Sequence, residues 1–388
     1  MTDHETAREP RRSGAPVVGM VGAGQLARMT GQAAVSLGIG FRVLAAAPDE
    51  SAAQVFAGTQ LGDYRSLDDL TAFAGGCDVV TFDHEHVPGP HLRTLERAGV
   101  KLRPAPDALR YTQDKRAMRE RLAGLDIACP RFAPAKGLDD VTAFTAGSGW
   151  PVVLKAVSGG YDGRGVWVCQ TPAEAAEVLA HPVGVFAEEH VGFDAELAAL
   201  VARSPHGQAA SYPVVQTVQR GGVCHEVLAP APRDAAGHAL AAQRIALELA
   251  AELGVTGLLA VELFETKGGL LVNEVAMRPH NSGHWTIEGA RTSQFEQHLR
   301  AVLDLPLGDP RAAAPCVAMA NVFGGTSPGV YARYTHVMAA DPSVKLNIYG
   351  KSVRPGRKIG HVTVLGDDMP TVRARAVDAA EYLATGRE

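Results

Sequence analysis

A strand, a glycine turn and a helix follow one another near the start of the chain, and this order constrains the fold most strongly. The apolar run 17–21 leads into Gly22-Ala23-Gly24 and then into a helical stretch over residues 25–37. This is the pattern of the first unit of an α/β domain. Further strand-like runs repeat the alternation at residues 41–47, 78–87 and 100–104. Up to about residue 110, the chain is therefore predicted to form an α/β domain with a parallel sheet.

The same turn fits the G-x-G-x-x-G/A pattern that binds pyrophosphate in dinucleotide-binding folds. An NAD site also needs an acidic residue at the end of the second strand, about 20 residues further on. Here the strand ends in Ala45-Ala46-Ala47-Pro48, Asp49 lies beyond the proline, and no arginine is present for a 2′-phosphate. The sequence therefore argues against NAD. It leaves open a helix N-terminus that binds another anion, or a turn without a ligand.

Composition excludes several classes of protein. The 388 residues suffice for two or three domains, and the net charge of −5 comes without a Lys/Arg block of the kind that binds nucleic acid. Apolar runs are too short to span a membrane, and residues 1–14 are predicted to be a disordered tail without a signal peptide. The five cysteines are scattered and never in C-x-x-C spacing, which favours a cytoplasmic protein without disulfides or zinc.

A second glycine-rich loop joins two strands between Lys155 and Val166. It is not a P-loop, because it lacks the G-K-[ST] ending and no helix follows it. Its glycines would allow backbone amides to close on phosphate oxygens: Gly159, Gly160, Gly163 and Gly165. The loop also holds three polar side chains, those of Tyr161, Asp162 and Arg164. We therefore favour a functional loop over a flexible hairpin.

The next strand-like segment ends in a run of polar residues, Glu188, Glu189, His190 and Val191, with Glu196 further on. An extended segment of this kind can offer backbone N–H and C=O groups to an adenine edge, and a carboxylate can bind ribose hydroxyls. Glutamates at a strand end are more often solvated. Both interpretations stay open for this segment taken alone.

Two glutamates are predicted to face each other in a hairpin. The strands 258–266 and 270–276 are joined by Lys267-Gly268-Gly269, a plausible three-residue turn, and this register opposes Glu262 and Glu274. Opposed like charges among apolar residues require a cation or a raised pKa. Hard oxygen ligands beside nucleotide phosphates favour Mg²⁺ or Mn²⁺ over zinc, and Asn273 adds another oxygen. The alternative is an edge hairpin with both glutamates in water.

Two further segments carry concentrated charge. Arg278, His280 and Asn281 follow the second glutamate within a few residues and suit a small oxyanion. His284 is expected to be a packing or capping residue. Near the C-terminal end, four cations surround a Pro-Gly turn in an otherwise acidic protein: Lys351, Arg354, Arg357 and Lys358. This turn is either a phosphate site or a solvated basic loop.

Five stretches occur in one order along nearly the whole chain: GAGQLARM, TFDHEHVP, LKAVSGGYDGRG, NEVAMRPHNSGHWT and VRPGRKIGH. Together they resemble the ATP-grasp superfamily and, within it, the N5-carboxyaminoimidazole ribonucleotide synthase family. The resemblance implies an α/β ATP-grasp fold with an N-terminal Rossmann-like (pre-ATP-grasp) domain and a small C-terminal β-rich region. The boundaries implied are a tail at 1–14, an N-terminal domain at 15–111, a small lid domain at 112–185, a large domain at 186–330 and a C-terminal region at 331–388.

The resemblance also implies a reaction in purine biosynthesis. ATP and bicarbonate would form carboxyphosphate, and the 5-amino group of 5-aminoimidazole ribonucleotide would take up the carboxyl group, with release of ADP and phosphate. Such a ligase would be a cytoplasmic homodimer with two Mg²⁺ ions, or Mn²⁺, and would have no nucleic-acid or membrane partner. Shared ATP-binding residues alone do not exclude another ATP-grasp ligase, such as formate-dependent glycinamide ribonucleotide transformylase or biotin carboxylase.

Carried over residue by residue, the resemblance implies four groups of site residues. ATP would be bound by Lys115, Lys155, the loop from Gly160 to Val166 (Gly160, Tyr161, Asp162, Gly163, Arg164, Gly165 and Val166), Glu188, Glu189, His190, Val191, Glu196, Asn273 and Glu274. Glu262 and Glu274 would hold the metal. Arg278, His280, Asn281 and Lys351 would act in catalysis. The ribonucleotide would contact Gln25, Leu26, Glu85, Tyr161, Asp162, Arg164, Lys351, Arg354 and Arg357.

The sequence departs from the family pattern at a few positions. Lys115 stands where many relatives have arginine, Gln219 stands where some have histidine, and Ala23 and Ala27 replace glycines of the first turn. A nucleotide-binding regulator with an inactive metal site is the non-enzymatic alternative. The intact pair Glu262/Glu274 argues against it.

Overall fold

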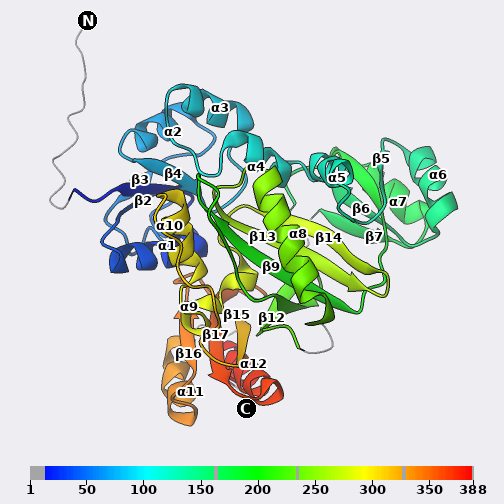
Figure 1. Ribbon diagram of the computed structural model, residues 1–388. Coiled ribbons are helices and arrows are strands. Elements are labelled where there is room, and N and C mark those ends of the chain that lie inside the picture. Colours follow the sequence, from blue (N-terminus) through cyan, green and yellow to red (C-terminus); the bar gives the residue numbers. More distant parts are fainter. Residues whose placement is uncertain (1–13, 161–164, 233–235, 326–328, 387–388) are drawn as a thin grey trace, which may run out of the picture.

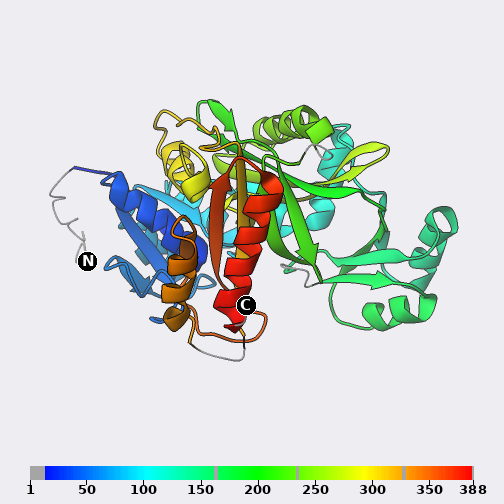
Figure 2. The ribbon, with the colours of Figure 1, turned by 90° about the horizontal axis from the view of Figure 1, so that it is seen from below.

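Three β-sheets organise the chain in the computed structural model, which describes residues 14–160, 165–232, 236–325 and 329–386 (Figure 1). The N-terminal sheet is parallel, whereas a small sheet and a nine-stranded sheet are antiparallel. Figure 2 shows the small sheet with its helices projecting to one side of the other two parts. In the part of the chain that the structure describes, no helix combines the length and apolar character needed to cross a membrane.

The N-terminal domain has the alternation predicted from the sequence, with strand order β3-β2-β1-β4. The stretch 100–104 is an exception, because Leu102 makes only an isolated bridge to Val80, and Pro104 has no N–H to continue a ladder. The elements are β1 (Val17–Val21), α1 (Gln25–Ser36), β2 (Gly40–Ala45), β3 (Thr59–Leu61), α2 (Leu67–Ala74), β4 (Val79–Phe82), α3 (Gly89–Arg97) and α4 (Pro106–Gln113).

The first glycine turn is filled by a side chain of the protein itself. Gly24 N–H donates to Asp83 Oδ2 at 2.6 Å, and Asp83 follows directly after β4. A Cβ atom on Gly22 would lie 1.8 Å from Asp83 Oδ1, and Gly22 has φ +99°. Glycine is required here because a buried carboxylate of the neighbouring strand packs into the turn.

The small domain is a four-stranded sheet with order β5-β8-β6-β7, covered by α6 and α7. The expected boundary between residues 185 and 186 is wrong for this sheet, because β8 pairs with both β5 and β6 and therefore belongs to the small domain. The Thr171 side chain caps α7. The elements are α5 (Lys115–Gly124), β5 (Phe132–Ala135), α6 (Leu138–Ser148), β6 (Val152–Ala156), β7 (Val166–Cys169), α7 (Pro172–Leu179) and β8 (Val185–Glu189).

The large sheet runs β14-β13-β9-β11-β12-β15-β17-β16, with β10 paired to β9. Helix α8 packs on one face of β9 and β13. The elements up to the C-terminal region are β9 (Ala195–Arg203), β10 (Ala209–Ser211), β11 (Val215–Arg220), β12 (Val223–Ala229), η1 (Ala236–His238), α8 (Ala239–Glu252), β13 (Gly257–Thr266), β14 (Gly269–Ala276), η2 (Asn281–Gly283), α9 (Thr286–Gly289) and α10 (Gln294–Val302).

The C-terminal strands extend this sheet instead of forming a separate one. β15 pairs with β12 and β17, and the strands on either side of the basic turn are β16 and β17. A long terminal helix, which the sequence interpretation missed, covers β15 and β17. The elements are β15 (Cys316–Phe323), η3 (Tyr331–Arg333), α11 (Tyr334–Ala340), β16 (Lys345–Ile348), β17 (Lys358–Gly366) and α12 (Met369–Thr385).

Helix α10 joins the N-terminal domain to the large sheet through a buried histidine. His298 Nε2 lies 2.8 Å from Thr81 Oγ1 of β4, and Leu258 N–H of β13 donates to His298 Nδ1 at 3.2 Å. Since Nδ1 is the acceptor, Nε2 carries the proton and donates to Thr81. Burial lowers the pKa of His298 to about 3, so the ring is neutral in the folded protein.

We expect His298 to make the protein acid-sensitive. An unfolded histidine has a pKa of about 6.5, so below that pH the histidine is protonated in the unfolded chain but stays neutral in the folded chain. The contribution of His298 to stability is complete above about pH 6.5 and falls by about 1.4 kcal/mol per pH unit below it. In His298→Gln, the free energy of unfolding measured in urea should lose this slope between about pH 6 and about pH 4. His206→Gln, at an exposed histidine, is the control; an unchanged slope in His298→Gln would contradict the assignment.

Candidate functional site

The predicted opposition of Glu262 and Glu274 is confirmed, but the hairpin reaches it differently. Thr266 pairs with Gly269, so the turn has two residues, Lys267 and Gly268, and not the predicted three. A β-bulge between Glu262 and Leu263 then restores the opposition. Without this bulge, the one-residue difference in the turn would set Asn273 opposite Glu262 and turn Glu274 to the other face of the sheet.

The two glutamates differ electrostatically. Burial, reinforced by Glu274 and Glu196, raises the pKa of Glu262 to about 7. Burial acts to raise the pKa of Glu274, but Lys115, with Lys155 and His280, holds that pKa below its usual value. Lys115 Nζ lies 2.7 Å from Glu274 Oε1. One glutamate thus stays ionised against a lysine, whereas the other resists ionisation.

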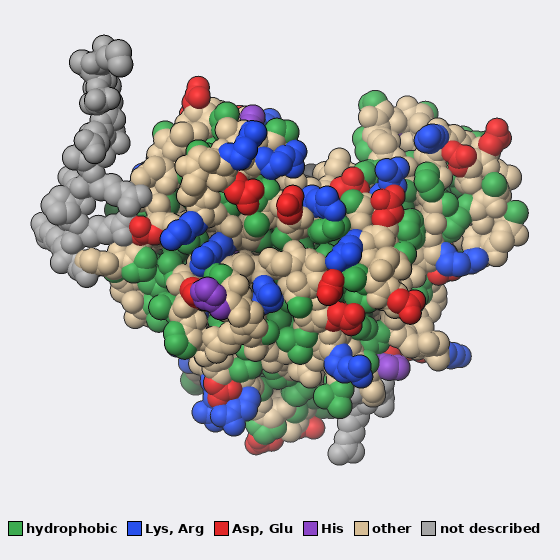
Figure 3. Space-filling view, turned by 45° about the horizontal axis from the view of Figure 1, so that its top comes forward, with side chains coloured by type: hydrophobic (Ala, Val, Ile, Leu, Met, Phe, Trp, Pro, Cys, Tyr) green, Lys and Arg blue, Asp and Glu red, His purple; other side chains and the backbone are tan. Residues whose placement is uncertain are grey.

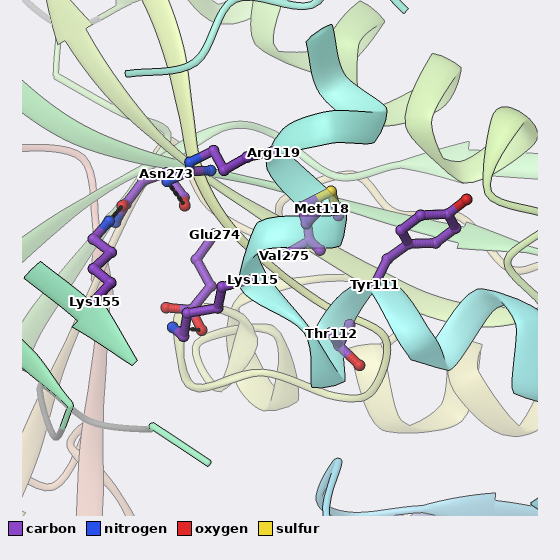
Figure 4. A pocket seen from close by; sticks show the side chains of 9 residues that line it. All are labelled: Tyr111, Thr112, Lys115, Met118, Arg119, Lys155, Asn273, Glu274 and Val275. Carbon is purple, nitrogen blue, oxygen red and sulfur yellow. Dashed lines mark hydrogen bonds and ion pairs between the residues drawn. The ribbon is translucent and has the colours of Figure 1, made fainter. Parts of the chain in front are cut away.

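A small pocket lies beside this pair, lined from α4, α5, β6 and β14 (Figure 4). In it Lys115 points to Glu274, and Lys155 points to Asn273 with an Nζ–Oδ1 distance of 3.0 Å. Lys155 is 8% exposed and also lies 2.5 Å from Glu188 Oε1. The structure thus brings together two lysines, an amide and the carboxylate pair, although these groups come from distant parts of the sequence. Such a group can neutralise and orient phosphate oxygens.

The segment after β14 presents the residues expected to hold an oxyanion. Arg278 Nε lies 2.7 Å from Glu85 Oε1, so the N-terminal domain reaches this segment. His280 Nε2 lies 3.7 Å from Glu262 Oε1. Asn281 and the buried Asn321 of β15 exchange side-chain amide hydrogen bonds of 3.1 and 2.8 Å. Cations and amide donors therefore gather next to the carboxylate pair.

The N-terminal helix and the basic turn meet in the structure. Lys351 Nζ donates to Gln25 Oε1 at the start of α1, and Gln54 of the N-terminal domain donates to the Gly350 carbonyl. Leu26 is buried beside Tyr349, so its side chain is a packing residue. Arg354 and Arg357 are exposed, and Arg357 donates to Ser352. A cationic turn and a helix N-terminus, both able to bind a phosphate, thus lie at one domain contact.

The face in Figure 3 is hollowed between the N-terminal domain and the small domain, with acidic and basic side chains close together below the notch. Helix α4, which carries two of the pocket residues, lies between the two lobes in Figure 1, and α5 lies at the edge of the small domain.

Comparisons with known proteins identify the family. The ATP-grasp domain family matches residues 120–295, the ribonucleotide synthetase preATP-grasp domain matches 16–113, and the phosphoribosylaminoimidazole carboxylase C-terminal domain matches 317–375. The N5-carboxyaminoimidazole ribonucleotide synthase of Mycobacterium tuberculosis is 55% identical over 96% of this chain and 89% of its own length. The chain belongs to the N5-carboxyaminoimidazole ribonucleotide synthase family.

Solved structures of this family have the same fold. The synthetase of Thermus thermophilus has a TM-score of 0.85 and 37% identity, and the match covers 95% of this chain and 98% of that one. The Aspergillus clavatus synthase, solved with ADP and 5-aminoimidazole ribonucleotide, has a TM-score of 0.87 and 30% identity, covering 95% and 99%. The predicted ATP-grasp fold with an N-terminal pre-ATP-grasp domain is therefore confirmed.

The structure limits what some of the residues expected to bind ATP can contact. The Glu188 side chain is 2% exposed and paired with Lys155 and Arg119, so it is not available to adenine. Glu189 pairs with Arg131, and β8 ends there, which leaves His190 and Val191 beyond the ladder. Burial raises the pKa of Glu196 to about 7.

Part of the expected lid lies outside the described residues, namely Tyr161, Asp162, Gly163 and Arg164. On either side of them, Gly159 and Gly165 have positive φ angles of +81° and +73°, and Gly160 precedes the gap. Val166 begins β7 and pairs with Lys155. The backbone conformations at both ends of the loop are thus ones that favour glycine.

Three buried residues of the site were missed by the sequence interpretation. Arg119 lies four residues after Lys115 on α5, a spacing that places both on one helical face and could have indicated it. Asn321 is a polar residue in the apolar run of β15, which is also a detectable signal. Gln294 hydrogen-bonds both the N–H and the carbonyl of His280, at 2.9 and 2.7 Å, and nothing in the sequence indicated this role.

Proposed function

We propose that this chain carboxylates 5-aminoimidazole ribonucleotide to N5-carboxyaminoimidazole ribonucleotide, using ATP and bicarbonate. The observation that carries the proposal is the partly buried pair Glu262/Glu274, flanked by Lys115 and Lys155 and followed directly by Arg278, His280 and Asn281. The Aspergillus relative was solved with ADP and the same ribonucleotide, which supports both the nucleotide and the substrate. Lys351 and Gln25 lie in contact, and a 5′-phosphate bound beside them would favour a ribonucleotide over the substrate of biotin carboxylase.

The reaction divides between two parts of the site. A bicarbonate oxygen attacks the ATP γ-phosphorus, the bond to the β-phosphate oxygen breaks, and ADP leaves. The 5-amino nitrogen of the ribonucleotide then attacks the carboxyl carbon of carboxyphosphate, phosphate leaves and the nitrogen loses a proton. Lys115 and Lys155 would neutralise the phosphates, whereas Arg278 and Asn281 would hold the bicarbonate oxygens. Closure of the glycine loop would exclude water from an intermediate that hydrolyses readily.

Glu262 and Glu274 fit a hard divalent cation. Among the described residues, no cluster of three or more His, Cys, Asp or Glu side chains is arranged to hold a metal by itself. Two carboxylates beside a phosphate pocket match the usual mode of Mg²⁺, which takes one or two carboxylates plus substrate phosphates. Bound there, Mg²⁺ or Mn²⁺ would neutralise charge on the transferred phosphoryl group. We further propose a cytoplasmic homodimer; all five cysteines are free thiols, which suits that compartment.

The first test is whether the ribonucleotide stimulates ATP turnover. With Mg²⁺ and bicarbonate present, adding 5-aminoimidazole ribonucleotide should accelerate ADP formation and yield a carboxylated product. The absence of both would overturn the proposal. Stimulation by glycinamide ribonucleotide with formate would instead support the transformylase alternative.

The basic turn has its own prediction. Arg357 is exposed and holds the turn through Ser352, and it can bind a phosphate in a bidentate manner. Arg357→Ala should raise the KM for the ribonucleotide by about tenfold or more, while the KM for ATP changes far less. Steady-state kinetics with each substrate varied in turn measure this. Arg375→Ala, an arginine of α12 that pairs with Asp341, is the matched control. An equal rise of both KM values would count against a phosphate site.

A further inference from the structure

One buried guanidinium links the two sides of the pocket that holds Lys115 and Lys155, here called the phosphate pocket. One side is the small-domain sheet and the other is the β13–β14 hairpin. Arg119 is 3% exposed and extends from α5 towards β14 (Figure 4). Its Nε donates to Glu188 Oε2 at 2.7 Å, and its two terminal nitrogens donate to the carbonyls of Val272 and Asn273, at 3.2 and 2.7 Å. A single side chain thus contacts the small-domain sheet and the hairpin that carries Glu274.

The two carbonyls belong to the bulge. In a regular strand, successive carbonyls point to opposite edges, so one guanidinium cannot take two in a row from the same side. Asn273 is the extra residue of the bulge, and β14 is the edge strand of the large sheet. Arg119 therefore satisfies the backbone acceptors that the bulge turns outwards. The bulge in turn is what opposes Glu274 to Glu262.

Towards the small domain, Arg119 positions Lys155 through the carboxylate of Glu188. Glu188 is shared between Arg119 and Lys155, with Oε2 on the arginine and Oε1 on the lysine. Lys155 also donates to Asn273 Oδ1, which closes a ring of contacts: Arg119, Glu188, Lys155 and Asn273. Removing the arginine would leave Glu188 buried with one partner and would free the backbone of the bulge.

We propose that Arg119 is a positioning residue that sets Lys155 and Glu274 in register with each other, so that phosphate oxygens and a divalent cation meet both at once. The role rests on the proposed use of this pocket for ATP. It requires a planar fork, because Nε and the two terminal nitrogens serve three acceptors in different directions. A lysine carries the same charge but cannot reproduce this pattern.

The test is Arg119→Lys. Calorimetry with ADP and Mg²⁺ should show the Kd for ADP raised by about 10- to 100-fold, with a matching rise in the Mg²⁺ concentration needed for half-maximal ATP turnover. The KM for the ribonucleotide should change by less than about threefold, since the ribonucleotide residues lie on other elements. Arg121→Lys is the matched control: it lies on the same helix, pairs with Glu252 and should leave both values unchanged.

Chemical rescue separates positioning from a general loss of structure. In Arg119→Ala, millimolar guanidinium should restore part of the ADP affinity, whereas ammonium should not. Arg119→Lys with an ADP Kd and Mg²⁺ dependence close to the wild-type values would overturn the proposal. If Arg119→Lys fails to fold, Arg119→Met combined with Glu188→Gln removes the buried pair together and is judged by the same ADP measurement.

The ADP measurement needs no ribonucleotide, so the two proposals fail separately. Wild-type protein that binds ADP but is not stimulated by 5-aminoimidazole ribonucleotide contradicts the proposed reaction only. An unchanged ADP Kd in Arg119→Lys contradicts the role of Arg119 only.

Discussion

Glu274→Gln should abolish turnover while the protein remains folded. The change keeps the size of the side chain but removes the charge that Lys115 holds at 2.7 Å and that a divalent cation would require. It also leaves Lys115 without its carboxylate partner beside the phosphates. Loss of one of the two carboxylates proposed to hold the cation, and of this ion pair, should lower kcat by about 10³-fold or more. ADP formation under saturating substrates measures kcat, and circular dichroism checks the fold.

The same hairpin offers a control for this variant. Glu265 is a buried carboxylate of β13 that lies on the opposite face from Glu262 and pairs with His238 at 2.7 Å. Glu265→Gln therefore removes a charge from the hairpin without touching the pocket, and it should keep most of the activity. Near-normal turnover in folded Glu274→Gln would refute its metal role, and equal losses in both variants would point to a general effect on the hairpin.

Arg278→Lys should have the second-largest effect. Arg278 is held by Glu85 from the N-terminal domain and stands directly after the β13–β14 hairpin, where bicarbonate would bind. Lysine keeps the charge but loses the bidentate geometry that suits a planar anion. We expect carboxylation to fall by about 10²- to 10³-fold, the range for loss of an oriented donor to a developing charge. ADP affinity should be unchanged, because the lysines of the phosphate pocket lie on α5 and β6.

The informative measurement for this variant is the ratio of ADP formed to carboxylated product formed. If Arg278 holds bicarbonate and carboxyphosphate, the ADP that is still formed should exceed the carboxylated product. Arg291→Lys, at an exposed arginine that pairs with Asp309, is the control. A proportional fall of ADP and product together with a weaker ADP affinity would place Arg278 at the nucleotide instead.

The hairpin shows how far sequence reasoning reaches. The opposition of Glu262 and Glu274 followed from strand alternation and a glycine turn, and it is present. The turn and the register beside it were wrong, because a two-residue turn and a bulge at Asn273 give the same opposition as a regular three-residue turn. Strand alternation predicts which residues share a face, but it does not reveal a bulge. The carbonyls that the bulge turns outwards are stabilised by Arg119, which lies on α5 and not in the hairpin sequence.

The first glycine turn illustrates a second limit. The strand, turn and helix were predicted correctly, and the missing acidic partner argued against NAD. The need for glycine could not be explained from the local sequence, because the group that fills the turn is Asp83, about 60 residues further along the chain. Contacts of this kind depend on the strand order β2-β1-β4, which brings β4 beside β1.

A β-rich C-terminal region was expected from residue 331, but its place in the fold was not predicted. β15 to β17 extend the large sheet, and this brings Asn321 to Asn281. Similarly, Lys351 reaches Gln25 because the basic turn folds back on the N-terminal domain. Whether α1 and the basic turn share the 5′-phosphate stays a prediction, which a structure with bound ribonucleotide would test.

The central claim is that bicarbonate is activated by ATP at Glu262 and Glu274 and transferred to the ribonucleotide amine. Turnover with ¹⁸O-labelled bicarbonate tests it most directly, because attack of a bicarbonate oxygen on the γ-phosphorus leaves that oxygen in the released phosphate. We predict ADP and carboxylated ribonucleotide in equal amounts, with one bicarbonate oxygen in each phosphate. Unlabelled phosphate, or ADP formed without carboxylated product in the wild-type protein, would contradict the account.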